Sequence, residues 1–249
     1  SLFNKTKRID AFFDGEIERI IQVNLDPIVA SPSKQTSIVS NDKNCSIQIT
    51  NNSLYDTSLI WIEKINHPVE PKGGARLSSV YQLQPFELAL KDTIRIGLRY
   101  SNHIKNMKNI SLYYYNQKDG WTFLPSSMHT NRQVIASTLF SLDAITIMQD
   151  IEPPFIRKVY PENGGKFHYK DLKTIYVIAD DYLSGLNSDE KSMSMKLDDI
   201  PVRYAFQPIK KELSYYLPTP LEDGEHTMEY KISDQAGNII SGISTFMVD

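Results

Sequence analysis

The sequence predicts an all-β fold made of two tandem β-sandwiches behind an extended N-terminal leader. Three observations support this prediction. Helical periodicity is almost absent, short runs alternate between apolar and polar residues, and breaks rich in Gly, Pro, Asn and Asp separate the runs. Tyrosine and phenylalanine, which favour sheets, number 14 and 10. Many short strands with regular turn signals are typical of sandwiches or barrels.

The run TIRIGLRY shows the alternation clearly. It places one set of side chains on one face of a predicted strand, with Arg95 and Arg99 on the other face. The first set is Ile94, Ile96, Leu98 and Tyr100. Apolar residues at every second position indicate a strand with one buried face and one solvent-exposed face. The other predicted strands are residues 46–50, 111–115, 133–139, 144–148, 174–180, 192–198, 213–217, 227–233 and 243–248.

The segment MQDIEPPFIRKVYP contains the best domain boundary. Two adjacent prolines cannot continue a sheet ladder and hold the chain extended. We therefore expect one sandwich over residues 38–149 and a second over residues 150–249, which has the length of an immunoglobulin-like domain.

Residues 1–37 are expected to form the leader. Within it, residues 16–25 alternate like a strand, which belongs either to a preceding domain or to the first sandwich. We favour the preceding domain. Residues 28–37, IVASPSKQTS, have the composition of a linker.

Composition narrows the classes of partner. The 249 residues carry a net charge of -3 with no dominant basic run, which argues against nucleic acid as a partner. No apolar run approaches the roughly 18 residues of a transmembrane helix. The one cysteine, Cys45, permits neither an intrachain disulfide nor a cysteine-based zinc site.

Residues 80–100, 109–127 and 134–148 resemble the ZU-type β-sandwich, which is known from ankyrins and netrin receptors and is widespread in bacterial surface proteins. The resemblance covers residues 38–148, although the glycine-rich start of the family pattern is poorly kept. The matching positions are Tyr81, Pro85, Phe86, Ile94, Tyr100, Trp121 and Leu124.

Residues 150–249 resemble a bacterial immunoglobulin-like domain, chiefly through the pairing of LEDGEH with DQAGN. This order of modules is similar to the C-terminal part of LytM-like zinc endopeptidases and other large envelope proteins. The resemblance implies an accessory region whose catalytic domain, where there is one, lies outside this chain.

The stretch DQAGN, Asp234 to Asn238, admits a metal site, a catalytic loop or a tight turn. We predict a hairpin turn between the last two strands. Asp and Asn side chains bond nearby backbone amides, and Gly237 adopts positive φ without steric cost.

Catalytic constellations are missing from the sequence. None of the five histidines lies in a nucleophile signature, and neither HxxxD nor HxH, which a LytM-like zinc centre requires, is present. Acidic pairs such as Asp198-Asp199 and Glu222-Asp223 flank strand ends, where carboxylates face water. We therefore predict that the chain is not an enzyme.

Calcium is the minority hypothesis for a metal, and no other cofactor is expected. Ca²⁺ takes oxygen ligands at the junctions of tandem sandwiches. The alternative is ordinary turn chemistry in solvated loops. The candidate ligands are Asp150, Glu152, Asp180, Asp181 and Asp234.

These features predict a non-catalytic spacer or docking region of a larger secreted, surface or periplasmic bacterial protein. Its partner would be a protein or a cell-wall polysaccharide. The alternative is a carbohydrate-binding or adhesion module that uses exposed aromatic residues, because every second tyrosine of runs such as Tyr113-Tyr114-Tyr115 and Tyr215-Tyr216 is expected to be exposed.

Overall fold

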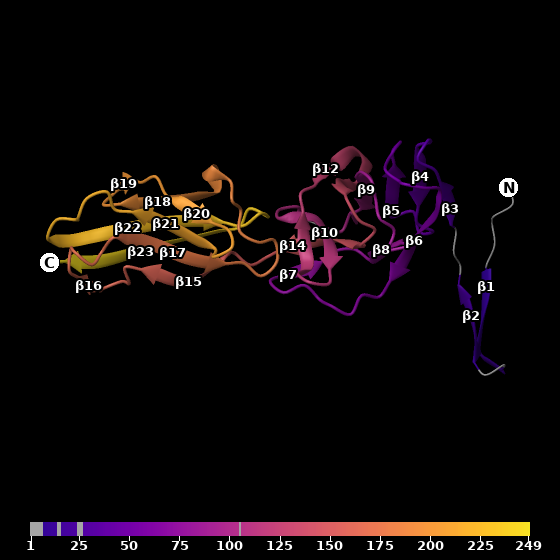
Figure 1. Cartoon of the computed structure of the whole chain (residues 1–249), viewed down its shortest axis with the longest axis horizontal. Coiled ribbons are helices and arrows are strands. Elements are labelled where there is room, and N and C mark those ends of the chain that lie inside the picture. Colours follow the sequence, from indigo (N-terminus) through magenta and orange to yellow (C-terminus); the bar gives the residue numbers. More distant parts are fainter. Residues whose placement is uncertain (1–6, 14–15, 24–26, 105) are drawn as a thin grey trace. The chain divides into compact units, whose positions relative to one another are not determined.

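The computed structural model describes residues 7–13, 16–23, 27–104 and 106–249 (Figure 1). Apart from two short 3-10 helices, Thr130–Arg132 and Glu190–Ser192, the regular elements in these ranges are strands. The all-β prediction is therefore confirmed.

The chain divides into two compact units. One contains residues 1–70 and 76–148, and the other contains residues 71–75 and 149–249. The sequence placed the boundary between residues 149 and 150, but it did not anticipate that Pro71–Ala75 belongs to the second unit. Five residues in the middle of the first predicted domain carry no compositional sign of such a change.

The described part of the leader contains an antiparallel hairpin of β1 (Lys7–Phe13) and β2 (Glu16–Val23). The strand predicted over residues 16–25 is present from Glu16 to Val23, and residues 24 and 25 lie outside the described ranges. Its assignment to a preceding domain stays a prediction. Parts of the expected linker are instead strands of the first sandwich, β3 (Ile28–Ala30) and β4 (Thr36–Val39). They form because Ala30 and the neighbouring Ile38 are buried in the core.

The first sandwich has two sheets. One runs in the order β11-β10-β14-β8-β6-β3, with β7 also paired to β14, and the other runs β12-β13-β9-β5-β4. The bounds of the remaining strands are β5 Cys45–Ile49, β6 Ser58–Ile65, β7 Gly74–Arg76, β8 Val80–Gln84, β9 Ile94–Arg99, β10 Ile110–Asn116, β11 Gly120–Leu124, β12 Ser127–His129, β13 Val134–Leu139 and β14 Ala144–Asp150.

The second sandwich has the immunoglobulin-like arrangement. Its sheets run β15-β17-β21-β20 and β16-β23-β22-β18-β19, which correspond to the ABED and GFC sheets of that fold with an extra strand on each side of the second sheet. The bounds are β15 Phe155–Tyr160, β16 Lys166–Phe167, β17 Thr174–Asp180, β18 Met193–Leu197, β19 Ile200–Pro201, β20 Ala205–Gln207, β21 Glu212–Tyr216, β22 Gly224–Ser233 and β23 Ile239–Val248.

Each sandwich encloses its own apolar core, to which both of its sheets contribute. In the first unit, Ile47 and Ile96 from one sheet belong to the same cluster as Leu83 and Ile147 from the other. In the second unit, Val177 of β17 and Met228 of β22 belong to one cluster although they come from different sheets. Period-two alternation explains this arrangement, because it turns every second side chain of a strand inward.

The outer face of each sheet carries the polar alternates. On β9, Ile94, Ile96 and Leu98 are buried, whereas Arg95 and Arg99 are exposed, as the sequence predicted. Cys45 is buried in the first core, and this burial raises the pKa of its thiol. It therefore behaves as a small apolar residue rather than a nucleophile.

Truncation of Ile47 to Ala should lower the free energy of unfolding of the first unit by about 2–5 kcal/mol, because it leaves a cavity in the core. Both tryptophans, Trp61 and Trp121, lie in this unit, so urea unfolding followed by tryptophan fluorescence reports on it alone. The matched control is Val39→Ala in the neighbouring strand, where the side chain is half exposed and the expected change is within about 0.5 kcal/mol. Equal effects of the two variants would contradict the assignment of this core.

Candidate metal centre

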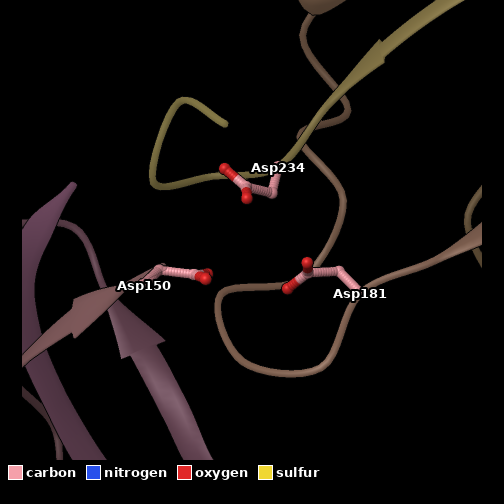
Figure 2. A group of neighbouring side chains, drawn as sticks. All are labelled: Asp150, Asp181 and Asp234. Carbon is pink, nitrogen blue, oxygen red and sulfur yellow. The ribbon is translucent and has the colours of Figure 1, made fainter. Parts of the chain in front are cut away.

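Three aspartates converge within the second unit (Figure 2). Asp150 is the last residue of β14, Asp181 directly follows β17, and Asp234 directly follows β22. One carboxylate oxygen from each lies within 4.8 Å of the others. Three segments that are far apart in the sequence therefore present their carboxylates to one small volume.

The DQAGN segment holds Asp234 in place. It connects β22 to β23 as a hairpin turn, so the turn prediction is confirmed. The backbone N–H of Asn238 donates to Asp234 Oδ1 at 2.8 Å, and its side-chain Nδ2 donates to Oδ2 at 2.8 Å. Gly237 has φ +96°, a region that favours glycine. The turn buries Asp234 completely.

Asp181 is the first residue of a tight loop whose backbone N–H groups donate hydrogen bonds to the Asp181 carboxylate. Asp181 Oδ2 accepts hydrogen bonds from the backbone N–H of Leu183 at 3.0 Å and of Gly185 at 2.8 Å. Gln235 fastens this loop to the hairpin turn, because its backbone N–H donates to the Gly185 carbonyl and its Nε2 donates to the Ser184 carbonyl. The two loops thus form one connected unit.

Asp150 completes the group from a third segment. Its Oδ2 accepts a hydrogen bond from the backbone N–H of Ser184 at 3.0 Å. Its Oδ1 is buried and has no hydrogen-bond partner within the described part of the chain, and the residue is 1% exposed. Figure 2 shows this carboxylate directed at the space between Asp181 and Asp234. A buried carboxylate oxygen without a partner is costly, so the arrangement calls for a proton or a cation.

The raised pKa values of two of the aspartates also indicate that their negative charge is poorly compensated. Burial, followed by the charges of Asp181 and Asp234, raises the pKa of Asp150 to about 6, against the hydrogen bond from Ser184 that lowers it. Burial and the charge of Asp181 also raise the pKa of Asp234. Among the described residues, no lysine, arginine or histidine forms an ion pair with any of the three.

The donor set matches a hard cation. All three groups offer carboxylate oxygens, and neither His nor Cys, which zinc prefers, belongs to the group. Ca²⁺ binds oxygen at about 2.3–2.6 Å, so ligands on opposite sides of the ion lie about 5 Å apart, which accommodates a spread of up to 4.8 Å. Mg²⁺, with bonds of about 2.0–2.1 Å, needs a tighter set.

Two of the five candidate ligands lie outside this group. Asp180 turns to other partners, since its carboxylate pairs with Arg157 at 3.5 Å and with Lys211. The side chain of Glu152 is exposed. Asp180 ends β17 beside its cationic partners, whereas Asp181 lies in the following loop and belongs to the group. The sequence did not reveal Asn238 and Ser184 as the residues that orient the carboxylates.

The tyrosine run at 113–115 does not form the exposed row that sugar stacking needs. Tyr113 is buried, Tyr114 packs against the first core, and Tyr115 packs on Trp121 with ring centroids 5.3 Å apart. The expected exposure of every second tyrosine holds for Tyr216, which is 68% exposed, but is wrong for the run at 113–115. That run is covered because Trp121 lies opposite Tyr115 on the neighbouring strand.

The imidazole of His226 bonds a turn and a neighbouring carboxylate. Its Nδ1 lies 2.7 Å from Asp198 Oδ2, and its Nε2 lies 2.8 Å from the Glu222 carbonyl. The two acceptors, which outweigh the effect of burial, raise the pKa of this imidazole. The pair closes a turn and contains no nucleophile.

No protein-family model matches this chain, and a search of curated proteins found no match. Among the described residues, no helix has the length and apolar character needed to cross a membrane.

Several solved structures show partial similarity. CopC from Methylosinus trichosporium OB3b is 20% identical with a TM-score of 0.32, over 39% of this chain and 93% of CopC. Dimeric latent PorU from Porphyromonas gingivalis is 8% identical with a TM-score of 0.31, over 64% of this chain and 22% of PorU. Immunoglobulin domains 1–4 of Sidekick-1 are 10% identical with a TM-score of 0.26, over 86% of this chain and 76% of that one. At these values no family is assigned.

In EDTA at pH 7, the substitution Asp150→Asn should raise the free energy of unfolding of the second unit. The raised pKa means that the folded unit binds more protons than the unfolded chain between about pH 4 and pH 6. Stability of the wild type therefore falls as pH rises through this window, by roughly 3 kcal/mol from Asp150 alone. The neutral amide removes that penalty.

Differential scanning calorimetry of wild type and Asp150→Asn between pH 4 and pH 8 tests this. The gain should be largest above pH 6 and vanish near pH 4. A variant that is less stable than wild type at pH 7 would contradict the inference that repulsion among the three carboxylates destabilises the folded unit.

Proposed function

We propose that this chain is a non-catalytic, calcium-binding module of a larger exported protein, in which it serves as a spacer or docking region. The observation that carries the proposal is the buried Oδ1 of Asp150, unpartnered in the described part of the chain and directed at the carboxylates of Asp181 and Asp234.

At neutral pH, calcium would reduce the repulsion among the three carboxylates more effectively than a proton would. With a pKa near 6, Asp150 is mostly ionised at pH 7, so protonation relieves the repulsion only in acid. A divalent cation neutralises charge over the whole neutral range and also gives Oδ1 a partner. The three residues would hold the ion, which needs further oxygens to reach six to eight ligands.

Three protein carboxylates do not complete the coordination shell of Ca²⁺, so we expect the site to bind it weakly. A weak site is occupied only where calcium is abundant, as it is outside the cell. Modules that work in millimolar calcium bind it with Kd values of about 10⁻⁴–10⁻³ M. This is the physical support for an exported, surface or periplasmic location.

The mechanical consequence of binding is local order. One ion would tie together the end of β14, the loop that begins at Asp181 and the turn that begins at Asp234. Removing flexibility from these segments lowers the entropic cost of presenting them to a partner. A spacer or docking module benefits from such rigidity.

The ZU-type resemblance of residues 38–148 supports an envelope setting, and the similarity to LytM-like endopeptidases supports a peptidase as the parent. A parent of that kind would carry HxxxD and HxH motifs elsewhere in its sequence. The structure offers less support for a sugar-binding module based on tyrosine and tryptophan, because Tyr113 and Trp121 are buried.

Calcium at 10 mM should stabilise the EDTA-treated wild type by about 1.5–3 kcal/mol, the gain expected when the ion exceeds its Kd ten- to hundredfold. Calorimetry should show the shift in the second unit, isothermal titration should show one site, and magnesium should be much less effective. Asp150→Asn and Asp181→Asn should each abolish the response.

The matched control is Glu152→Gln, which removes one carboxylate of the same segment but outside the group. It should keep the full calcium response. No calcium-dependent shift in the wild type, together with stabilisation on acidification, would establish a protonated carboxyl network in place of a metal centre.

A further inference from the structure

The first unit contains a basic groove of about 1250 Å³ on the outer face of the sheet β12-β13-β9-β5-β4. Four of the residues that line it are cations, Lys43, Arg95, Arg99 and Arg132, and all four are exposed. No Asp or Glu is among the described residues that line it. The groove is thus strongly positive in a chain whose net charge is -3.

The floor of the groove is built from small residues in register. Gly97 of β9 pairs with Ser46 of β5 on one side and with Ala136 of β13 on the other. A Cβ on Gly97 would meet Val134 at 3.1 Å and Ser46 at 3.3 Å, so the floor is already closely packed. Small side chains in a row across three strands leave a shallow channel over the sheet.

Arginines stand on both sides of this channel. Arg95 and Arg99 lie two residues before and two after Gly97, on the same face of β9, and their Cα atoms are about 13 Å apart along the strand. An extended ligand that follows the small residues would pass between two guanidinium groups. Arginine binds carboxylate and sulfate groups well because its planar fork donates two parallel hydrogen bonds.

Two turns add the remaining cations at the Arg99 end. Lys43 lies in the turn between β4 and β5, where the Asn44 carbonyl accepts a hydrogen bond from the Arg99 N–H. Arg132 lies in the 3-10 helix before β13, and the Gln133 carbonyl accepts from the N–H of Tyr100.

These four cations are available for a ligand. None of them forms an ion pair within the described ranges. The one carboxylate in the β4–β5 turn, Asp42, is engaged elsewhere, since it accepts hydrogen bonds from Ser40 and Tyr81 at 2.7 Å each.

We propose that this groove binds an anionic polysaccharide whose sugars carry carboxylate or sulfate groups. Amide and hydroxyl side chains, including Asn44, Ser46, Gln48 and Asn131, line the groove and suit sugar hydroxyls. The site lies in the first unit and is independent of the calcium hypothesis for the second.

Other classes of ligand fit less well. Among the described residues that line the groove there is no Phe, Tyr or Trp, so they provide no stacking platform of the kind on which single-stranded nucleic acids and neutral sugars depend. The floor strands β5, β9 and β13 are interior strands of the sheet, so a peptide cannot add to them as a further strand.

The test is isothermal titration of the full chain in EDTA with four oligomers of similar length. They are polygalacturonate for carboxylate groups, heparin oligosaccharides for sulfate groups, dextran as a neutral glycan and oligo(dT) as a nucleic acid polyanion. We expect at least one of the two anionic glycans to bind, with an affinity that falls as salt rises, and dextran not to bind.

The double variant Arg95→Gln/Arg99→Gln should weaken glycan binding about tenfold or more, because it removes two charge-assisted hydrogen-bonding groups. Ser46→Tyr keeps every cation but fills the channel, and it should weaken binding to a similar extent. The charge-matched control Arg203→Gln/Lys210→Gln removes two exposed cations of the second unit and should leave the affinity within twofold. Tryptophan fluorescence melting verifies that each groove variant is folded.

Three results would overturn the proposal. They are the absence of binding to either anionic glycan, equal losses in the groove variants and the charge-matched control, and binding of oligo(dT) as tight as that of the better glycan. Because EDTA is present throughout, failure of the calcium hypothesis does not affect this experiment.

Discussion

Both sandwiches depend on the burial of one face of each of two sheets. Because of that requirement, alternate side chains of each strand point into the core. Polar side chains that could bind a ligand therefore lie on the outer faces of the sheets or in the loops at their ends. The two candidate sites occupy one place each. The basic groove lies on an outer face, and the three aspartates lie where strands end. Neither site interrupts an apolar core cluster, so each can be added without changing the packing between the sheets.

The aspartate group differs from the groove in what it demands of the fold. Exposed arginines are stable in water without partners, whereas buried carboxylates are not. Asp150 and Asp234 are nearly inaccessible, and each is held by backbone or amide donors that satisfy some of its oxygens but not its charge. Residual charge in a dry site means that the apo fold is under electrostatic tension. Under the proposed function, binding of a cation would therefore be coupled to folding of these loops.

Much of the fold followed from period-two alternation and turn chemistry. TIRIGLRY, for example, has the predicted inside and outside faces, and DQAGN forms the predicted turn because Asp, Gly and Asn specify it locally. The failures were non-local. Residues 28–30 have a linker-like composition, but pairing with β6 makes them a strand. The 113–115 run alternates, yet packing of Tyr115 against Trp121 removes the exposure that alternation alone implies.

The candidate metal ligands show the same division. Sequence reasoning named segments that the structure brings together, because acidic residues gather at strand ends, but it had no means of choosing between Asp180 and Asp181. Topology makes that choice. Asp180 closes β17 and faces Arg157 on the adjacent β15, where an ion pair neutralises it, while Asp181 has already left the strand and turns toward the loop that ends at Gly185. One residue of offset thus separates a carboxylate that has two cationic partners from one that has none among the described residues and lies beside two buried carboxylates. A carboxylate without a cationic partner is the better indicator of a binding site, because a bound cation would offset the unfavourable free energy of its charge.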